Sequence, residues 1–272
     1  MHVTAADGTR LFYRDWGSGP PVVFTHSWSL HSAMWEYQFT ALLAEGFRCV
    51  AHDRRGHGRS DERGRGYDLH TLAGDLAALL EHLDLRDVTL VGHSMGCSEI
   101  VRYLAAHGSE RVSRAVLVGA MTPLLLRTDD APEGLDPMFL QATLQALRTD
   151  RPRWFRESAA GYFATAGTGS WVSPALVDDG VATILACPLE VQTTCLQVVM
   201  GTDLRADLRG IDVPVLLVHG DADESAPIDL TARRTAPLIP DARLEVYAGA
   251  PHGLYVTEAA RLTKDVLAFA RP

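Results

Sequence analysis

The sequence lacks the features that would indicate a membrane span, an exported chain or a structural metal. No apolar stretch approaches the roughly eighteen residues that cross a bilayer, and the opening residues MHVTAADGTRLFYRDWG do not run from basic to apolar as a signal peptide does. Four cysteines (Cys49, Cys97, Cys187, Cys195) form no CxxC pair and no zinc-type spacing. We therefore expect a cytoplasmic protein with structural thiols, no bound metal and no membrane partner.

Positive charge is also scarce, with 25 Lys and Arg against 34 Asp and Glu and a net charge of -9. An acidic chain argues against a nucleic-acid partner. The basic run DRRGHGRS is too short and glycine-rich to change that expectation. The 272 residues are 47% apolar, which is enough for one large domain with a core or for a domain with an insertion.

Short β-rich apolar runs alternate with longer segments of helical spacing, such as LHTLAGDLAALLEHLD and TEAARLTKDVLAFA. The later runs are almost continuous Val and Leu, as expected for parallel strands covered on both faces. The alternation predicts a three-layer α/β fold, and the closely spaced first runs predict an antiparallel hairpin at its start. The predicted strands are residues 11–16, 21–24, 47–50, 88–91, 115–118, 213–218 and 244–247.

The alternation is interrupted between residues 122 and 205. This part has no convincing strand but holds helical segments rich in large side chains. We interpret residues 122–205 as a helical cap inserted into a core formed by residues 1–121 and 206–272. Because a cap over a sheet must have an inner face, we expect some of its aromatic residues to line a pocket.

Residues Gly92-His93-Ser94-Met95-Gly96 fit the pattern G-x-S-x-G between a predicted strand and a predicted helix. Glycines beside the serine allow strand and helix to approach closely at a strained turn. Such a turn presents the serine hydroxyl above the carboxyl edge of the sheet, where ligands of open α/β sheets bind. The alternative is a turn serine without chemistry. His93 is expected only to pack against its neighbours.

A serine hydroxyl needs a base, and the base needs an acid that orients it. His252, in VYAGAPHGLYV, lies between the last strand and the last helix, and three acids follow the strand that ends VLLVHG. A backbone amide at a helix start, that of Met95, can stabilise an oxyanion. A second amide would come from the loop FTHSWS. The candidate acids are Asp221, Asp223 and Glu224.

Taken together, these segments resemble the cofactor-free haloperoxidase, perhydrolase and aryl-esterase branch of the α/β-hydrolases over nearly the whole chain. The matching stretches are DGTRLFYRDWGSGPPVVFTHSWSLHSAMWEYQ, DRRGHGRSD, VTLVGHSMG, IDVPVLLVHGDAD and APHGL. The resemblance implies an α/β-hydrolase fold, with a mostly parallel central sheet flanked by helices, and no cofactor. It implies Ser94 as nucleophile, His252 as base, Asp223 as acid, and the amides of Trp28 and Met95 as the oxyanion hole. Asp221 would instead bond to the loop backbone.

The chain departs from this family at the oxyanion loop. The usual His-Gly-aromatic is His26-Ser27-Trp28, and Ser29 stands where peracid-forming relatives often carry proline. We expect His26 to brace the loop, hydrolysis to dominate over perhydrolysis, and Ser29→Pro to raise peracid formation. The segment HDRRGHGRSD, with three possible metal ligands, is interpreted as a turn beneath the active-site edge. Those possible ligands are His52, Asp53 and His57.

The sequence therefore predicts a serine hydrolase that cleaves small carboxylic esters through an acyl-enzyme, with weak perhydrolysis as a side activity. A lactone or an amide is the alternative substrate for the same residues. A carbon–carbon lyase or a ligand receptor on the same fold is the alternative of another class. A homo-oligomer is possible. The residues expected to line the substrate pocket are Ser27, Leu125, Phe139, Trp154, Phe163, Ile228 and Leu254.

Overall fold

The computed structural model describes residues 1–163 and 172–271, and its centre is an eight-stranded sheet with the order β1-β2-β4-β3-β5-β6-β7-β8. The first two pairings, β1 with β2 and β2 with β4, are antiparallel, and the others are parallel. This confirms the predicted mostly parallel sheet with an antiparallel start. The strands are β1 (His2–Thr4), β2 (Arg10–Trp16), β3 (Pro21–Thr25), β4 (Arg48–His52), β5 (Val88–His93), β6 (Val112–Val118), β7 (Val215–Gly220) and β8 (Ala242–Tyr247).

Every strand predicted from the apolar runs is present, and its ends differ from the predicted ones by at most three residues. Strand β1 was missed because it has three residues and one buried side chain, too few for a periodic pattern. All side chains of β5 and β7 are buried, as their continuous apolar sequences require. These two strands lead into the segments that carry Ser94 and Asp223.

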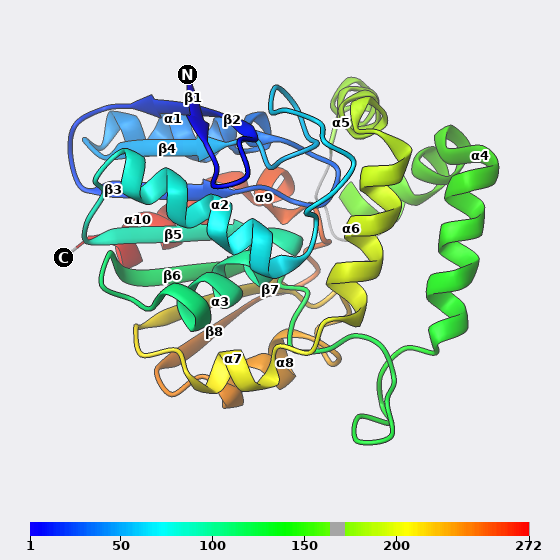
Figure 1. Cartoon of the computed structure of the whole chain (residues 1–272). Coiled ribbons are helices and arrows are strands. Elements are labelled where there is room, and N and C mark those ends of the chain that lie inside the picture. The colour runs from blue at the N-terminus through cyan, green and yellow to red at the C-terminus, as the bar shows by residue number, and fades with distance from the viewer. Residues whose placement is uncertain (164–171, 272) are drawn as a thin grey trace.

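Helices cover both faces of the sheet, with α2 and α3 on one face and α1 and α10 on the other (Figure 1). Helix α2 begins where the Asp68 side chain accepts a hydrogen bond from the Thr71 amide at 2.9 Å, an N-cap interaction. The helices outside the insertion are η1 (Ser32–Trp35), α1 (Glu36–Ala44), α2 (Leu69–His82), α3 (Met95–His107), α8 (Ala232–Thr235), η2 (Ala236–Leu238), α9 (Leu254–Thr257) and α10 (Ala259–Ala270).

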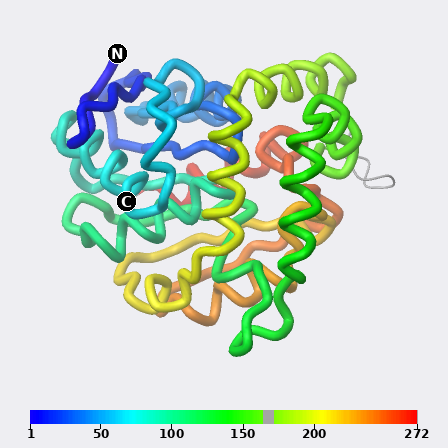
Figure 2. Tube along the Cα trace, turned by 45° about the vertical axis from the view of Figure 1, so that its right-hand side comes forward, coloured from blue at the N-terminus to red at the C-terminus, as the bar shows by residue number. Residues whose placement is uncertain are grey.

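The insertion between β6 and β7 is helical, as predicted, and consists of α4 (Pro137–Phe163), α5 (Pro174–Ala186), α6 (Leu189–Gly201) and α7 (Arg205–Arg209). Helix α4 is broken at Asp150, which has φ −151° and ψ 75° and lies two residues before Pro152. Helices α4 and α6 stand side by side beyond the strand ends (Figure 2). No single described helix is long and apolar enough to cross a membrane, although α5 and α6, bent by 95°, meet that length and composition test as a pair.

Candidate active site

Ser94 occupies the corner between β5 and α3 with φ 55° and ψ −118°. Few residues other than glycine adopt a positive φ, so this backbone is strained and must be held by its surroundings. The Ser94 amide donates a hydrogen bond of 2.9 Å to the Val118 carbonyl on β6. The corner is therefore fixed to the neighbouring strand, with Ser94 at the edge where the parallel strands end.

The two glycines of the motif are required by close contacts. A Cβ on Gly92 would lie 2.8 Å from the carbonyl carbon of Gly96, and a Cβ on Gly96 would lie 2.7 Å from the Thr25 carbonyl oxygen. Real Cβ atoms do not approach so closely, so a larger residue at either position would push α3 away from β3 and β5.

His252 and Asp223 meet at the carboxyl ends of β7 and β8. Nδ1 of His252 lies 2.6 Å from Oδ2 of Asp223. Oδ1 of Asp223 accepts hydrogen bonds from the amides of Ser225 at 2.9 Å and Ala226 at 2.7 Å. Burial raises the pKa of Asp223, but the charge of His252 and hydrogen bonds from His219 and His252 outweigh it and hold that pKa well below its usual value. Asp223 is therefore a carboxylate.

His93, in the G-x-S-x-G motif, contacts both the backbone carbonyl and the ring of His252. Its Nε2 lies 2.9 Å from the His252 carbonyl oxygen, and the two ring centroids are 4.8 Å apart. Burial and the nearby charge of His252 lower the pKa of His93 to about 3, so the ring is neutral and Nε2 donates the bond. Packing alone was expected for His93. Its hydrogen bond joins segments 159 residues apart, and no local pattern indicates it.

Ser94 and His252 line one cavity of about 440 Å³ between the sheet edge and the inserted helices. No hydrogen bond joins Ser94 to the His252 ring within the described residues. Such bonds are often long before substrate binds. The cavity wall is mostly apolar, and its acidic side chains are Glu157 and Glu224, both of which are exposed.

Four of the seven residues predicted for the pocket line this cavity, namely Ser27, Phe139, Trp154 and Phe163. The other three do not, which corrects the prediction. Leu125, Ile228 and Leu254 are at most 6% exposed and belong to the hydrophobic core, and none of them is among the residues that line the cavity. Their apolar character was compatible with either position.

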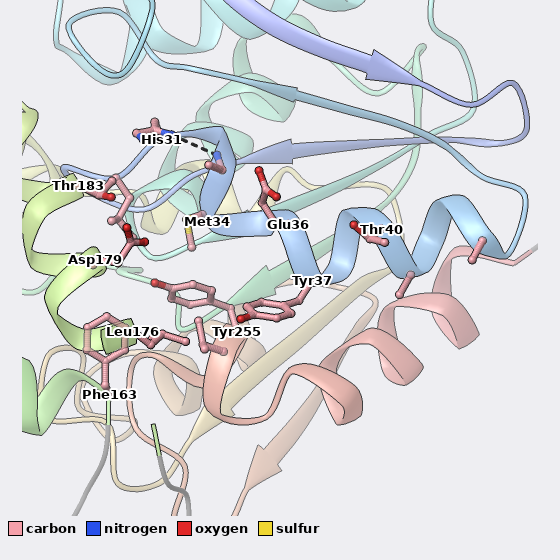
Figure 3. A pocket seen from close by; sticks show the side chains of 16 residues that line it. His31, Met34, Glu36, Tyr37, Thr40, Phe163, Leu176, Asp179, Thr183 and Tyr255 are labelled. Atoms are coloured by element: carbon pink, nitrogen blue, oxygen red, sulfur yellow. Dashed lines mark hydrogen bonds between the residues drawn. The ribbon is translucent and has the colours of Figure 1, made fainter. Parts of the chain in front are cut away.

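A larger hollow of about 750 Å³ lies between α1, α5 and α9 and contains neither Ser94 nor His252. Figure 3 shows side chains that line it, with Tyr37 coming from α1, Leu176 from α5 and Tyr255 from α9. Phe163 borders both this hollow and the cavity of Ser94. We assign the candidate site to the smaller cavity because the chemically competent side chains are there.

Comparisons with known proteins identify the family of this chain. The family model described as alpha/beta hydrolase fold matches residues 20–259. A non-heme haloperoxidase of Rhodococcus erythropolis is 41% identical over 268 residues, 98% of each chain, and a bifunctional esterase/perhydrolase of Acinetobacter calcoaceticus is 36% identical over 99% of each. This chain belongs to the α/β-hydrolase family. An esterase structure from Exiguobacterium antarcticum superposes with a TM-score of 0.94 at 31% identity, covering 100% of this chain and 99% of its own.

The resemblance noted in the sequence is thereby confirmed. The protein is a hydrolase of the α/β fold, related to non-heme haloperoxidases, esterase/perhydrolases and esterases.

In this α/β hydrolase, Met95 is the first residue of α3, so its backbone N–H has no acceptor within the helix. Trp28 lies in the loop after β3 and lines the cavity beside Ser27. Its indole Nε1 donates to the Gln192 carbonyl of α6 at 2.9 Å, and its ring meets that of Trp154 edge-on at 6.2 Å. The loop is thus anchored to the insertion.

Ser29 is buried and has φ 62°. A proline ring holds φ near −65°, so Ser29→Pro cannot be accommodated without rebuilding the loop. The expectation that Ser29→Pro raises peracid formation relative to ester hydrolysis stays a prediction, and it requires the loop backbone to change because that backbone is left-handed at Ser29. Sequence alone does not show the sign of φ at a serine.

Tyr162 belongs to the cavity wall but was not among the predicted site residues. Its ring lies edge-on to the His252 ring, with centroids 5.2 Å apart, and its carbonyl accepts a 2.6 Å hydrogen bond from the Gly253 amide. Burial raises the pKa of Tyr162 to about 12, so the phenol is neutral. The only signal in the sequence was an aromatic residue beside Phe163 in the inserted helices.

The segment with three possible metal ligands forms turns, as predicted. Oδ1 of Asp53 accepts from the Ser32 amide and Oδ2 from the Arg59 amide, each at 2.9 Å. Within residues 1–163 and 172–271, no group of three or more His, Cys, Asp or Glu side chains is arranged to hold a metal ion.

Proposed function

We propose that this α/β hydrolase cleaves small carboxylic esters through an acyl-enzyme formed on Ser94. The observation that carries the proposal is the 2.6 Å contact between His252 Nδ1 and Asp223 Oδ2 in the wall of the cavity that Ser94 also lines. A carboxylate at Nδ1 leaves Nε2 of the neutral ring as the base. The relatives named as esterases support this substrate class.

In the proposed reaction, His252 accepts the Ser94 proton as Oγ attacks the ester carbonyl. The amides of Trp28 and Met95 stabilise the tetrahedral oxyanion, and the imidazolium then protonates the leaving alcohol. Water, activated by His252, attacks the acyl-enzyme and releases the acid and free Ser94. Asp223 remains ionised and stabilises the imidazolium throughout.

The apolar wall favours uncharged substrates, and we assign its outer part to a cap of residues 122–205 over a core of residues 1–121 and 206–272. Inserted residues Trp154, Ile184 and Val199 contribute to this wall. Lactones fit the same chemistry. The relative named as an esterase/perhydrolase supports weak perhydrolysis, in which hydrogen peroxide replaces water and the product is a peracid.

The test is Ser94→Ala beside Ser98→Ala, whose hydroxyl is buried one turn along α3 and donates to the Met121 carbonyl at 3.3 Å. We expect Ser94→Ala to lower kcat on p-nitrophenyl esters about a millionfold and Ser98→Ala to change it little. A fluorophosphonate should form one covalent adduct, detected by mass spectrometry, on the wild type and on Ser98→Ala but not on Ser94→Ala. Turnover of esters by Ser94→Ala at the wild-type rate, or equal labelling of it, would contradict the proposal.

A further inference from the structure

We propose that Arg54 is a positioning residue, which orients and polarises the peptide unit whose N–H, at Trp28, serves as an oxyanion donor. Glu99 holds the Arg54 guanidinium in place. This inference rests on the proposed function, since it concerns how that oxyanion hole is built.

The Arg54 side chain, 1% exposed, lies under the loop that precedes Trp28. Nη2 of Arg54 donates to the His26 carbonyl at 2.7 Å, and Nη1 donates to the Ser27 carbonyl at 3.3 Å. Nε donates to the Glu99 carboxylate, which is 1% exposed. One guanidinium therefore contacts two consecutive carbonyls of the loop.

The His26 ring supplies a second hydrogen-bond donor to the Ser27 carbonyl. Its Nε2 accepts a 2.8 Å hydrogen bond from the Arg54 backbone amide, so the proton of the neutral ring is on Nδ1. Nδ1 then donates to the Ser27 carbonyl at 2.8 Å. Burial, followed by the charge of Arg54, holds the pKa of His26 well below its usual value, which keeps the ring neutral.

The Ser27 carbonyl and the Trp28 N–H belong to one planar trans peptide and point in opposite directions. Donors fixed on the carbonyl oxygen therefore fix the direction of the N–H. Hydrogen bonds to a peptide oxygen also polarise its N–H and make it a stronger donor. Arg54 and His26 thus act on the far side of the peptide from the cavity, without touching substrate.

Glu99 connects this arrangement to the nucleophile. It lies on α3, five residues after Ser94, so the buried ion pair joins the oxyanion loop to the helix whose first amide is the other donor. Thr25 makes a parallel link by donating from Oγ1 to the Gly96 carbonyl at 3.0 Å. A buried ion pair is by itself weak evidence of a stabilising role, so a role in placing the two donors explains it better.

Arg55 provides a matched control. It is 2% exposed and forms a bidentate pair with Asp75 of α2, with two bonds of 2.6 Å. Its remaining side-chain bonds in the described structure go to Asp7, away from the oxyanion loop. Arg54 and Arg55 are therefore neighbouring arginines with similar burial and ion pairing, and only Arg54 contacts the loop.

The experiment uses a trifluoromethyl ketone with a ¹³C-labelled carbonyl, which adds to the serine as a tetrahedral hemiketal. Its ¹³C shift, followed against pH, reports the pKa of the hemiketal oxygen, a direct measure of oxyanion stabilisation. We expect Arg54→Lys, which loses the planar fork, to raise that pKa by about one unit. It should lower kcat/KM for p-nitrophenyl esters about ten- to a hundredfold with KM little changed.

Arg55→Lys should lower thermal stability without moving the hemiketal pKa. If Arg54→Lys does not fold, the double variant Arg54→Met/Glu99→Met replaces it, because removing both charges leaves no unpaired buried charge. Its control is Arg55→Met/Asp75→Met. The Arg54 pair should raise the hemiketal pKa and the Arg55 pair should not. An unchanged hemiketal pKa in the Arg54 variants would overturn the positioning role. Failure of the wild type to form any adduct would instead contradict the proposed function.

Discussion

Two carboxylates at the end of β7 have different partners although one residue separates them. Asp223 is buried and contacts His252, whereas Asp221 is exposed and accepts a 2.6 Å hydrogen bond from the Gly249 amide. The first can hold an imidazolium, and the second can only shape the loop between β8 and α9. The position of each single side chain therefore decides which of the two acids contacts His252.

We therefore expect Asp223→Asn to lower kcat by about four orders of magnitude near neutral pH, because the amide favours the wrong imidazole tautomer. Asp221→Asn should cost far less, since an amide oxygen can still accept from Gly249. Steady-state kinetics of both variants on one ester at pH 7 provide the measurement. The reverse ranking would show that Asp221 is the acid.

At the scale of elements, the first turn of α4 carries two adjacent apolar residues with different surroundings. Phe139 is 54% exposed and lines the cavity, whereas Met138 is 71% exposed and is not part of its wall. Helix α4 thus presents one face to the cavity and one to solvent at the same level, as an amphipathic helix does.

Phe139→Ala should change the preference among esters of increasing acyl length about tenfold, since a methylene in an apolar pocket is worth about 1–3 kcal/mol. Met138→Ala is the control and should leave the profile unchanged. Trimming Trp154 or Phe163 should also act on selectivity more than on the chemical step. Ratios of kcat/KM over an acyl series measure the effect, and equal profiles for wild type and all trimmed variants would place substrate elsewhere.

At the scale of the whole molecule, four of the buried histidines have a lowered pKa and stay neutral. Burial is the main cause that lowers the pKa of His52 to about 4 and those of His57 and His93 to about 3, and it holds the pKa of His26 well below its usual value. The rings of His26 and His57 lie 5.1 Å apart, so protonation of one disfavours the other.

These shifts predict loss of stability in mild acid. Below about pH 6.5 the unfolded chain binds protons that the folded histidines do not, so the free energy of unfolding falls as the pH falls toward the folded pKa. Each such histidine removes about 1.4 kcal/mol per pH unit in that window. Asp223, with its lowered pKa, adds a loss at lower pH, as the pH falls below the carboxyl's ordinary value.

Urea unfolding at intervals between pH 8 and pH 5 measures this slope. His57→Gln should reduce it by about one proton, because the folded protein keeps this ring neutral over that pH range. A free energy of unfolding that is flat from pH 7 to pH 5 would contradict the prediction.

The sequence alone was sufficient to predict the alternation of strands and helices and the steric role of the glycines around Ser94. Strand periodicity and the steric demand of a tight corner are local, so they can be read from consecutive residues. The order of serine, acids and histidine along the chain also indicated which loops would meet, once the segments were recognised as those of a known fold.

Only the tertiary structure decided which side chains face one another. The contact of His252 with Asp223 rather than Asp221, and the pairing of Arg54 with Glu99, depend on the packing of segments far apart in the chain. The sign of φ at Ser29 and the burial of Leu125 away from the cavity follow from how the loop and insertion settle on the sheet. Residue type is compatible with several such arrangements, and close packing of the whole molecule selects one.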